Sequence, residues 1–406
     1  MPPDSSAPSA SSGEGPSRWR RPLLAVGGGL VVLLTGAALL SRGAGDGAEP
    51  ARAAASKDGS QGTLSRGGGG GGSGGGSQEG AEADAAPRRF ESGTCWRDLE
   101  RFNEQVTLGT FREWAAPLLA SRDGVVRAYL KERLTELIGN DAGRAQEVLG
   151  WARDAQGKEF QVFLSALRDS EAVQQPQVAA KLLASGLDAT LEPGRRAGML
   201  SALDTQKRLE PAALDTLANF AKDPGSGEAG WAATRSLARV MKKDFAQSGN
   251  AAPYLDKLLT IGTDSPDENI RYLAQSMPMH AAPVLDAAST ERYSRILTSE
   301  GNEDGRDAAA HNLSLSQDKA KVLELFAQTF PREPSVCVRW ALFRFSARVA
   351  GQEALPVMAK MAASDPRFQP QYRVFEQLYA SGVLDFMRVW NSLPDQDPFG
   401  CMDKHD

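Results

Sequence analysis

The amino-acid sequence predicts an all-α protein: a right-handed α-solenoid of antiparallel helix pairs, preceded by one transmembrane helix and a disordered Gly-rich linker. Three observations support this prediction. Residues 22–41 carry no charge. From Phe90 onward apolar residues recur at helical spacing, and runs of alternating β-branched residues are missing. Five arginines recur at intervals of 36, 35, 33 and 34 residues, a period typical of stacked helical repeats.

The chain begins with a tail and a predicted membrane anchor. Residues 1–17 are rich in Pro, Ser, Ala and Gly, and they hold too little apolar surface to offset ordering entropy, so we expect a disordered cytoplasmic tail. Residues 18–41 are the predicted transmembrane anchor. Their uncharged part, residues 22–41, can span roughly 30 Å as a helix, the thickness of one hydrocarbon core. Arginines crowd the N-terminal flank, so the positive-inside rule keeps the N-terminus cytoplasmic and exports the rest.

A cleaved signal peptide is the alternative to an anchor, because small residues such as Ala51-Arg52-Ala53 offer a cleavage site downstream. The apolar core is longer than the usual signal-peptide core of about 7–15 residues, which favours the anchor. A soluble secreted binding protein would result from cleavage. In either case the C-terminal domain is exported, and for the anchored form we expect a single-pass inner-membrane protein with a periplasmic domain.

Residues 42–89 form the predicted linker. The glycine runs 67–72 and 74–76 indicate a flexible coil, and no Gly-Lys-Ser/Thr follows them, so they are not a phosphate loop. A Gly-rich chain of this length reaches about 35–40 Å in root-mean-square terms. The linker therefore lets the exported domain search a shell around its anchor.

Residues 90–406 are predicted to fold into about sixteen helices, most of about 10–18 residues, separated by Gly, Pro, Asn and Asp. The arginine period does not extend cleanly before residue 195. We therefore expect residues 90–190 to form degenerate helical hairpins that act as an N-terminal cap, and residues 191–406 to form the repeat region with a C-terminal cap.

The repeat period is carried by five arginines, each preceded by a turn with Asp, Asn, Ser, Gly or Pro and followed by a helical apolar stretch. They are Arg235, Arg271, Arg306, Arg339 and Arg373. Alanines lie three residues after the first three of them, on the same helix face. The repeat unit is therefore a turn, a helix, a short turn and a second helix.

Two of these segments resemble the second helix of HEAT-like repeats. Ile270-Arg271-x-x-Ala274 and Val338-Arg339 each follow an acidic or Pro-containing turn, and the resemblance covers about residues 190–390. It implies that the repeated arginines pair with the acidic residue of the turn and with helix-end carbonyls, which is a structural role. Other α-solenoids remain an alternative, although the Trp-x-x-Leu-Gly pattern of tetratricopeptide repeats is absent.

The chain departs from the HEAT-like pattern at two repeats. Glu376 stands where a small residue would follow Arg373, and Gly305 precedes Arg306 in place of Val or Ile.

HEAT-like arrays place the helices after the repeated turns on their inner face. The resemblance therefore implies four partner-surface candidates, Arg271, Tyr272, Arg339 and Arg344, each of which can equally serve the fold. Trp231 and Trp340 fall on apolar helix faces and are predicted to lie in the core.

Three cysteines are expected in an oxidising compartment. The two ends of a solenoid lie far apart, which disfavours a bridge from Cys95 to Cys401. Cys337 begins a helix in the penultimate unit, and the tail that carries Cys401 can fold back onto it. We predict a Cys337–Cys401 disulfide, with three buried or free thiols as the alternative.

The composition excludes several classes of function. Residues 90–406 hold 37 basic and 43 acidic side chains, and no basic stripe stands free of acids, so nucleic-acid binding is disfavoured. The three histidines belong to no metal or nucleophile motif, and Cys401-x-x-x-His405 reads as a polar terminus. We therefore predict no catalytic residue, no cofactor and no metal.

The sequence indicates a membrane-anchored, exported helical-repeat scaffold that binds protein partners in the cell envelope. The alternative is an accessory, lyase-like enzyme with a small-molecule pocket in the solenoid. A scaffold should carry an extended surface of mixed charge, whereas an enzyme needs one deep pocket with convergent polar groups. The sequence does not identify the partner or the oligomeric state.

Overall fold

The computed structural model describes residues 95–119 and 123–401, which belong to one unit spanning Gly80–Asp406. The predicted tail, anchor and linker lie outside the described residues. The described part is all-α: it contains 18 α-helices, seven 3₁₀ helices and no strand, although Leu285 and Ser316 form an isolated parallel β-bridge. No helix of this part is long and apolar enough to cross a membrane.

The α-helices vary in length, from six residues in α18 to 22 in α9. They are α1 (Trp96–Gln105), α2 (Phe111–Leu119), α3 (Gly124–Ile138), α4 (Ala142–Asp154), α5 (Gly157–Asp169), α6 (Pro176–Leu187), α7 (Pro193–Ala202), α8 (Pro211–Ala221), α9 (Gly227–Ser248), α10 (Ala252–Asp264), α11 (Glu268–Ser276), α12 (Ala287–Ser299), α13 (Glu303–Leu313), α14 (Lys319–Thr329), α15 (Val336–Ala350), α16 (Leu355–Ser364), α17 (Gln369–Ala380) and α18 (Phe386–Asn391). The 3₁₀ helices are η1 (Leu108–Thr110), η2 (Glu171–Gln174), η3 (Leu203–Thr205), η4 (Met277–His280), η5 (Phe330–Arg332), η6 (Gly351–Ala354) and η7 (Pro366–Phe368).

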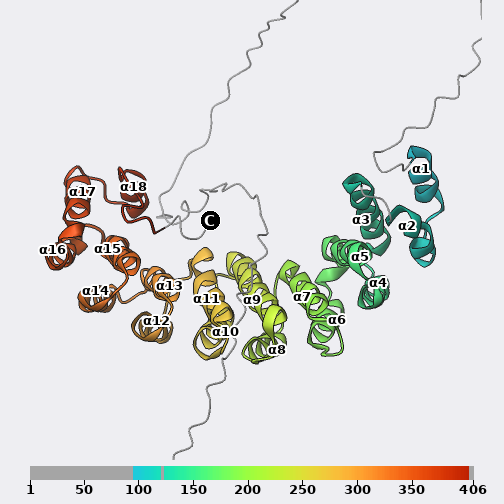
Figure 1. Ribbon diagram of the computed structural model, residues 1–406, viewed down its shortest axis with the longest axis horizontal. Coiled ribbons are helices and arrows are strands. Elements are labelled where there is room, and N and C mark those ends of the chain that lie inside the picture. The colour runs from blue at the N-terminus through green and yellow to red at the C-terminus, as the bar shows by residue number, and fades with distance from the viewer. Residues whose placement is uncertain (1–94, 120–122, 402–406) are drawn as a thin grey trace, which may run out of the picture. The chain divides into compact units, whose positions relative to one another are not determined.

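The helices pack as consecutive pairs, which follow one another in chain order in Figure 1. Partners within a pair are α2 and α3, α4 and α5, α6 and α7, α8 and α9, α10 and α11, α12 and α13, α14 and α15, and α16 and α17. The second helices also contact one another from pair to pair, from α3 through α5, α7, α9, α11 and α13 to α15. We call them the second-helix layer, and we call α2, α4, α6, α8, α10, α12, α14 and α16 the first-helix layer. Contacts between neighbouring pairs are typical of a helical repeat.

Short polar side chains start many of these helices, as the sequence predicted. At several N-termini a side-chain oxygen accepts a hydrogen bond from a backbone N–H of the first turn, which has no partner within the helix. The capping residues are Asp123, Asp141, Glu192, Asp267, Asp286, Asn302, Asp318, Ser335 and Asp385. These caps start nine of the 18 described α-helices, so the sequence locates the starts of those helices well.

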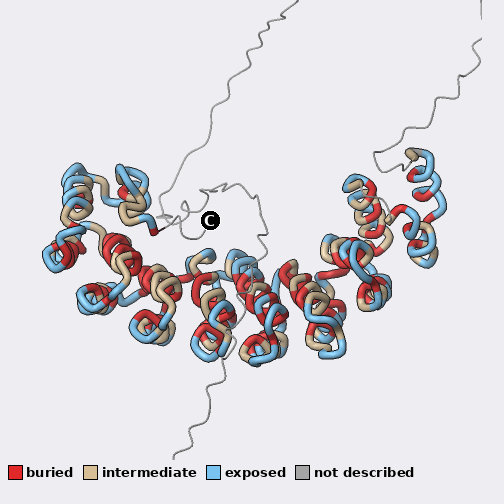
Figure 2. The backbone as a smooth tube through the Cα atoms, viewed as in Figure 1, coloured by how far each residue is buried: buried red, intermediate tan, exposed pale blue. Residues whose placement is uncertain are grey.

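Apolar side chains are buried between the two layers, where the red segments of Figure 2 lie. Trp340 is fully buried, as predicted, and its indole packs against the rings of Phe343 and Phe399. The prediction for Trp231 is wrong, because 37% of this residue is exposed. Its indole lies beneath the guanidinium of Arg235, with the ring centroid 4.9 Å from the guanidinium carbon, and it lines a hollow shared with α5 and α7. A cation over an aromatic face explains why a tryptophan is tolerated there.

Three of the repeated arginines share one set of contacts, and we call Arg271, Arg306 and Arg339 the turn arginines. Each is the fourth residue of its helix and donates to backbone carbonyls of the turn just before that helix. Each also pairs with an acid in the turn before the second helix of the next pair: Arg271 with Glu300 at 3.4 Å, Arg306 with Glu333 at 2.7 Å and Arg339 with Asp365 at 2.8 Å. The acids thus belong to the next turn rather than to the arginine's own turn, because second helices pack side by side and a long side chain reaches across.

The other two repeated arginines do not make these contacts. Arg235 is the ninth residue of the long helix α9, too far from the turn, and it donates to Ser201 Oγ at 2.9 Å. Arg373 is exposed on α17, and no further pair with an acidic turn follows it within the described residues. The period of the arginines therefore holds along the sequence, whereas their shared role is limited to α11, α13 and α15.

Gly305 departs from the HEAT-like pattern for a steric reason. A Cβ at this position would lie 2.4 Å from Oε1 of Gln275 on the neighbouring helix α11. Gln275 is buried and donates to Gly262 O at 2.7 Å and to Glu300 Oε2 at 3.0 Å. The glycine makes room for this buried amide.

Candidate functional site: two cationic clusters on the second helices

The four partner-surface candidates all lie in the second-helix layer, Arg271 and Tyr272 on α11 and Arg339 and Arg344 on α15. Arg271 and Arg339 are turn arginines, whose guanidinium groups are engaged by acids and carbonyls of the turns. These two arginines therefore stabilise the contacts between neighbouring helix pairs. Tyr272 and Arg344 are not used in this way.

The carboxylate of Asp307 acts on both Tyr272 and Arg344. Arg344 donates from Nη2 to Asp307 Oδ2 of α13 at 3.3 Å, and only 10% of its side chain is exposed. Burial raises the pKa of the Tyr272 hydroxyl, and the carboxylates of Asp304 and Asp307 raise it further. Both residues are thus influenced by the acids of α13, which lies between α11 and α15 in the second-helix layer.

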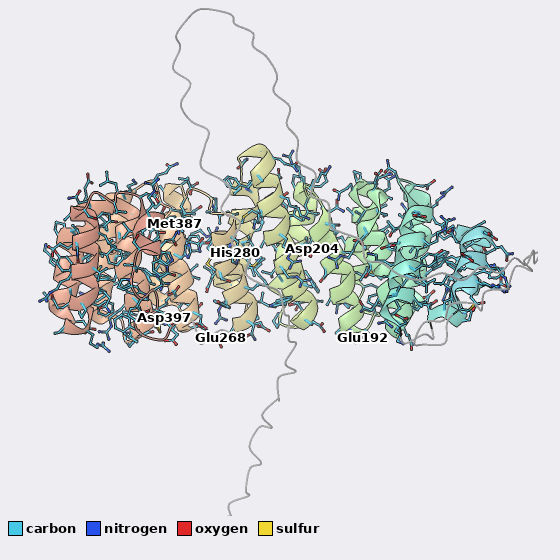
Figure 3. The ribbon with its side chains drawn as sticks, turned by 90° about the horizontal axis from the view of Figure 1, so that it is seen from above. Glu192, Asp204, Glu268, His280, Met387 and Asp397 are labelled. Carbon is cyan, nitrogen blue, oxygen red and sulfur yellow. A yellow bond between two sulfur atoms is a disulfide. The ribbon has the colours of Figure 1, made fainter. Side chains whose placement is uncertain are left out.

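Arg344 also lines a cavity of about 310 Å³ between α13, α15 and α18, which we call the α15 pocket. Its lining side chains are His311, Arg344, Phe345, Arg348, Phe386, Met387 and Trp390. Met387 is exposed at the surface, and Figure 3 labels it toward one end of the unit. The pocket combines two guanidinium groups, one imidazole and three aromatic rings.

The imidazole of His311 is uncharged in this pocket. Arg348 Nη1 lies 2.7 Å from His311 Nε2, so that nitrogen accepts the hydrogen bond and the ring is neutral. Burial, together with the charges of Arg348 and Arg344, lowers the pKa of His311 to about 3. His311 is therefore an acceptor that orients Arg348, rather than a cation.

The two arginines are poorly compensated. Burial lowers the pKa of both Arg344 and Arg348, although a guanidinium remains charged in proteins. Asp307 is the carboxylate that bonds Arg344, whereas Arg348 has no ion-pair partner among the residues that the structure describes. The charge of Arg348 thus has no carboxylate partner among the described residues in a partly desolvated place.

A disulfide holds the wall of the pocket in position. Cys337 at the start of α15 is joined to Cys401, with the two Cα atoms 5.4 Å apart, and we call this bond the C-terminal disulfide. The returning segment also bonds α15 and α18: Trp340 Nε1 donates to Gln396 O at 3.2 Å, and Gln396 Nε2 donates to Trp390 O at 3.0 Å. The predicted pairing of Cys337 with Cys401 is what the structure has, and Cys95 is a free thiol.

A second cationic group surrounds Asp204 on α5, η3 and α9. Arg168 and Arg239 donate to the two carboxylate oxygens of Asp204 at 3.2 and 2.6 Å, and Lys243 donates to its backbone carbonyl. Arg235 lies one turn before Arg239 on the same helix. We call Arg168, Arg235, Arg239 and Lys243 the α9 cluster; Figure 3 labels Asp204 nearer the middle of the unit.

The charges of the α9 cluster are close enough to disfavour one another. Burial lowers the pKa of Arg235 and of Lys243, and the neighbouring Arg239 lowers both further. The Asp204 carboxylate accepts from Arg168 and Arg239, whereas Lys243 bonds the Asp204 backbone carbonyl and Arg235 bonds Ser201 Oγ. Beside them lies a hollow of about 300 Å³, whose lining includes Trp231, Arg235 and one acid, Glu228.

Sequence reasoning missed most of both clusters. The spacing of Arg235, Arg239 and Lys243 by four residues could have indicated one cationic stripe on a helix. Arg344 and Arg348 have the same spacing. Nothing in the sequence pointed to Asp204 or to His311 as their neighbours, because those contacts cross from one helix to another.

The described residues show no metal-binding group of three or more His, Cys, Asp and Glu. His405 of the Cys401-x-x-x-His405 segment lies outside the described range. Comparison with protein-family models, with curated proteins and with solved structures found no match.

Proposed function

We propose that this chain is a membrane-anchored, exported scaffold built as a right-handed, HEAT-like α-solenoid, and that it binds an acidic protein partner in the cell envelope. The solenoid assignment is supported by the succession of helix pairs and by the turn arginines, which bridge one repeat to the next. The membrane assignment is supported by the uncharged residues 22–41 and their arginine-rich flank.

The observation that carries the binding proposal is the α9 cluster. Residues 90–406 have a net charge of −6, yet four cations gather around one buried carboxylate on the second-helix layer. Like charges held this close destabilise the free protein, and a partner that supplies carboxylates would relieve the repulsion. The exposed indole of Trp231 adds an aromatic contact beside them, a residue type common at binding hot spots.

The test is crosslinking in cell membranes with the intact chain. A photoreactive amino acid placed at Trp231 should capture a protein partner, and the same group at Val284, which is 64% exposed outside the second-helix layer, should not. The double variant Arg235→Gln/Lys243→Gln should lose the crosslink, because it removes two cations and leaves the Arg168 and Arg239 bonds to Asp204 in place.

A matched control removes the same charge elsewhere. Lys181 on α6 and Lys319 on α14 are exposed in the first-helix layer, so Lys181→Gln/Lys319→Gln should keep the crosslink. Raising the salt concentration should weaken capture by the unmodified chain, since exposed charges are screened. Recovery of lipids alone, or equal capture by both double variants, would count against the proposal.

The enzyme alternative has less support. The α15 pocket supplies convergent polar groups, but its imidazole has a pKa of about 3 and is a poor general base near neutral pH. The third possibility, a soluble secreted form of the same scaffold, depends on N-terminal processing. The intact mass of the exported protein distinguishes it, because cleavage removes the uncharged segment 22–41.

A further inference from the structure

We propose that the α15 pocket is a binding site for a carboxylate attached to an aromatic or branched apolar group. The site is separate from the α9 cluster and does not depend on the partner proposed above. Its ligand chemistry follows from the donors left on the two arginines, the aromatic walls and the size of the cavity.

The cationic side chains of the pocket favour an anionic ligand. A guanidinium has five N–H donors. Among the described side chains, Arg348 uses its Nη1 on the neutral His311, and Arg344 uses its Nη2 on Asp307. Asp397 also lies near enough to act on Arg344, and no described carboxylate pairs with Arg348. A monoanion would pair with Arg348, which has no carboxylate partner there, in a place where solvent screens poorly.

The geometry suits a planar, two-oxygen anion. Arg344 and Arg348 are four residues apart on α15 and therefore lie on one face of that helix. A carboxylate can accept from both guanidinium groups, and forked donors match its two oxygens. His311, which accepts from Arg348, holds that guanidinium in one orientation without adding a competing negative charge.

The walls of the pocket favour an apolar group beside that anion. The guanidinium carbon of Arg344 lies 4.8 Å from the ring centroid of Phe345 and 5.8 Å from that of Trp390. Phe386 stacks on Trp390 with centroids 6.3 Å apart, and the exposed Met387 borders the opening. A hydrated tetrahedral anion such as phosphate gains nothing from such walls, whereas an aromatic ring does.

The volume and the rigidity of the site agree with this ligand. The cavity of about 310 Å³ lies at the small end of the range for ligand pockets, about 300–1,000 Å³, which suits a single ring with its carboxylate. The C-terminal disulfide and the bonds around Gln396 fix α18 against α15, so the walls are preorganised. The ligand can be a free aromatic acid or the C-terminal residue of a polypeptide, which share this chemistry.

The experiment is a calorimetric titration of the intact chain with N-acetylphenylalanine, with its primary amide and with inorganic phosphate. We expect saturable binding of the acid and at least tenfold weaker binding of the amide and of phosphate. A peptide ending in Phe identifies the source: tighter binding than the free acid favours a polypeptide C-terminus, and equal binding favours a small molecule. Equal binding of acid and amide, or no binding of either, would overturn the proposal.

Variants locate the site. Arg348→Gln should weaken binding of the acid at least tenfold, and Arg348→Lys should lie between that variant and the unmodified chain, because a lysine keeps the charge but not the fork. Arg388→Gln is the matched control, since Arg388 is exposed on α18 and does not line the pocket.

Two further measurements distinguish misfolding of a variant from loss of its binding site. Circular dichroism of Arg348→Gln shows whether the variant folds, and the comparison of acid with amide on the unmodified chain needs no variant at all. The Arg235→Gln/Lys243→Gln protein should bind the acid as the unmodified chain does. Loss of acid binding in that protein would contradict the assignment to the α15 pocket.

Discussion

Removal of the ion pair between Arg306 and Glu333 tests how strongly the turn arginines stabilise the contact between neighbouring helix pairs. Arg306 Nε and Nη2 donate to the two oxygens of Glu333 at 2.9 and 2.7 Å, and its Nη1 donates to Glu300 O and Gly301 O at 3.0 and 2.9 Å. The two side chains are only 12% and 3% exposed. Arg306→Met leaves the Glu333 carboxylate buried with a single remaining donor, the backbone N–H of Ser335.

The expected magnitude follows from that uncompensated charge. Removal of one member of a buried ion pair costs about 3–5 kcal/mol, much more than the net value of the pair. Glu333→Leu should also destabilise, since it leaves the guanidinium with carbonyl partners alone. The double variant Arg306→Met/Glu333→Leu should cost clearly less than the sum, with a coupling of about 2 kcal/mol or more, because neither charge is left behind.

The assay is urea unfolding combined with hydrogen exchange read by mass spectrometry. Repeat arrays can open unit by unit, so a single global transition does not suffice. In Arg306→Met, protection of the backbone amides from exchange should fall first in α13 and α15, which the Arg306–Glu333 ion pair connects. Lys321→Met is the control: Lys321 and Glu291 are 51% and 53% exposed, and we expect no measurable change. If Arg306→Met costs no more than this control, or if the single effects simply add, the reasoning fails.

Three further predictions concern stability. The pKa of His311 is lowered to about 3 in the folded chain, whereas an unfolded histidine has a pKa near 6.5. Below pH 6.5 the unfolded chain therefore binds a proton that the folded chain does not, which favours unfolding. The contribution of His311 to the free energy of unfolding should be complete above pH 6.5, and the free energy should fall by about 2 kcal/mol between pH 7.5 and pH 5. His311→Phe should flatten this slope in thermal melts. Gly186→Ala should destabilise by about 1–3 kcal/mol, because its Cβ would lie 2.4 Å from Leu200 Cγ, whereas Gly150→Ala on an open helix surface should stabilise by up to about 1 kcal/mol. The C-terminal disulfide closes a separation of 64 residues, so its reduction should cost about 4 kcal/mol in the chain-entropy model; an unchanged melting temperature with reductant would contradict this.

The different burial of Trp231 and Trp340 shows what helical periodicity does not predict. Both follow helical apolar patterns, and both were predicted to lie in the core. Trp340 packs against Phe399 and Phe368, which the chain returns to α15, whereas Trp231 lies under the guanidinium of Arg235 and borders an open hollow. Periodicity identifies an apolar stripe, but which residue at the edge of that stripe becomes covered depends on the neighbouring elements.

The turn arginines show the same limit on a smaller scale. Their spacing, the acids of the turns and the structural role were readable from the sequence. The partner of each arginine was not, because it lies in the next repeat: Arg339, for example, pairs with Asp365 at the start of η7. The role of Arg235 also differed, since α9 begins earlier relative to its arginine than α11, α13 and α15 do.

The sequence by itself determined the all-α class and the positions of the turns, because helical periodicity and caps act over short distances. It favoured the pairing of Cys337 with Cys401 but left free thiols open, and the structure has the bond. Only the tertiary structure decided which charges lie together. Asp204 gathers cations from α5 and α9, and the α15 pocket joins His311 to arginines 33 and 37 residues later along the chain and to α18 beyond them. Such contacts depend on how helix faces pack across repeats, which no local pattern of residues encodes.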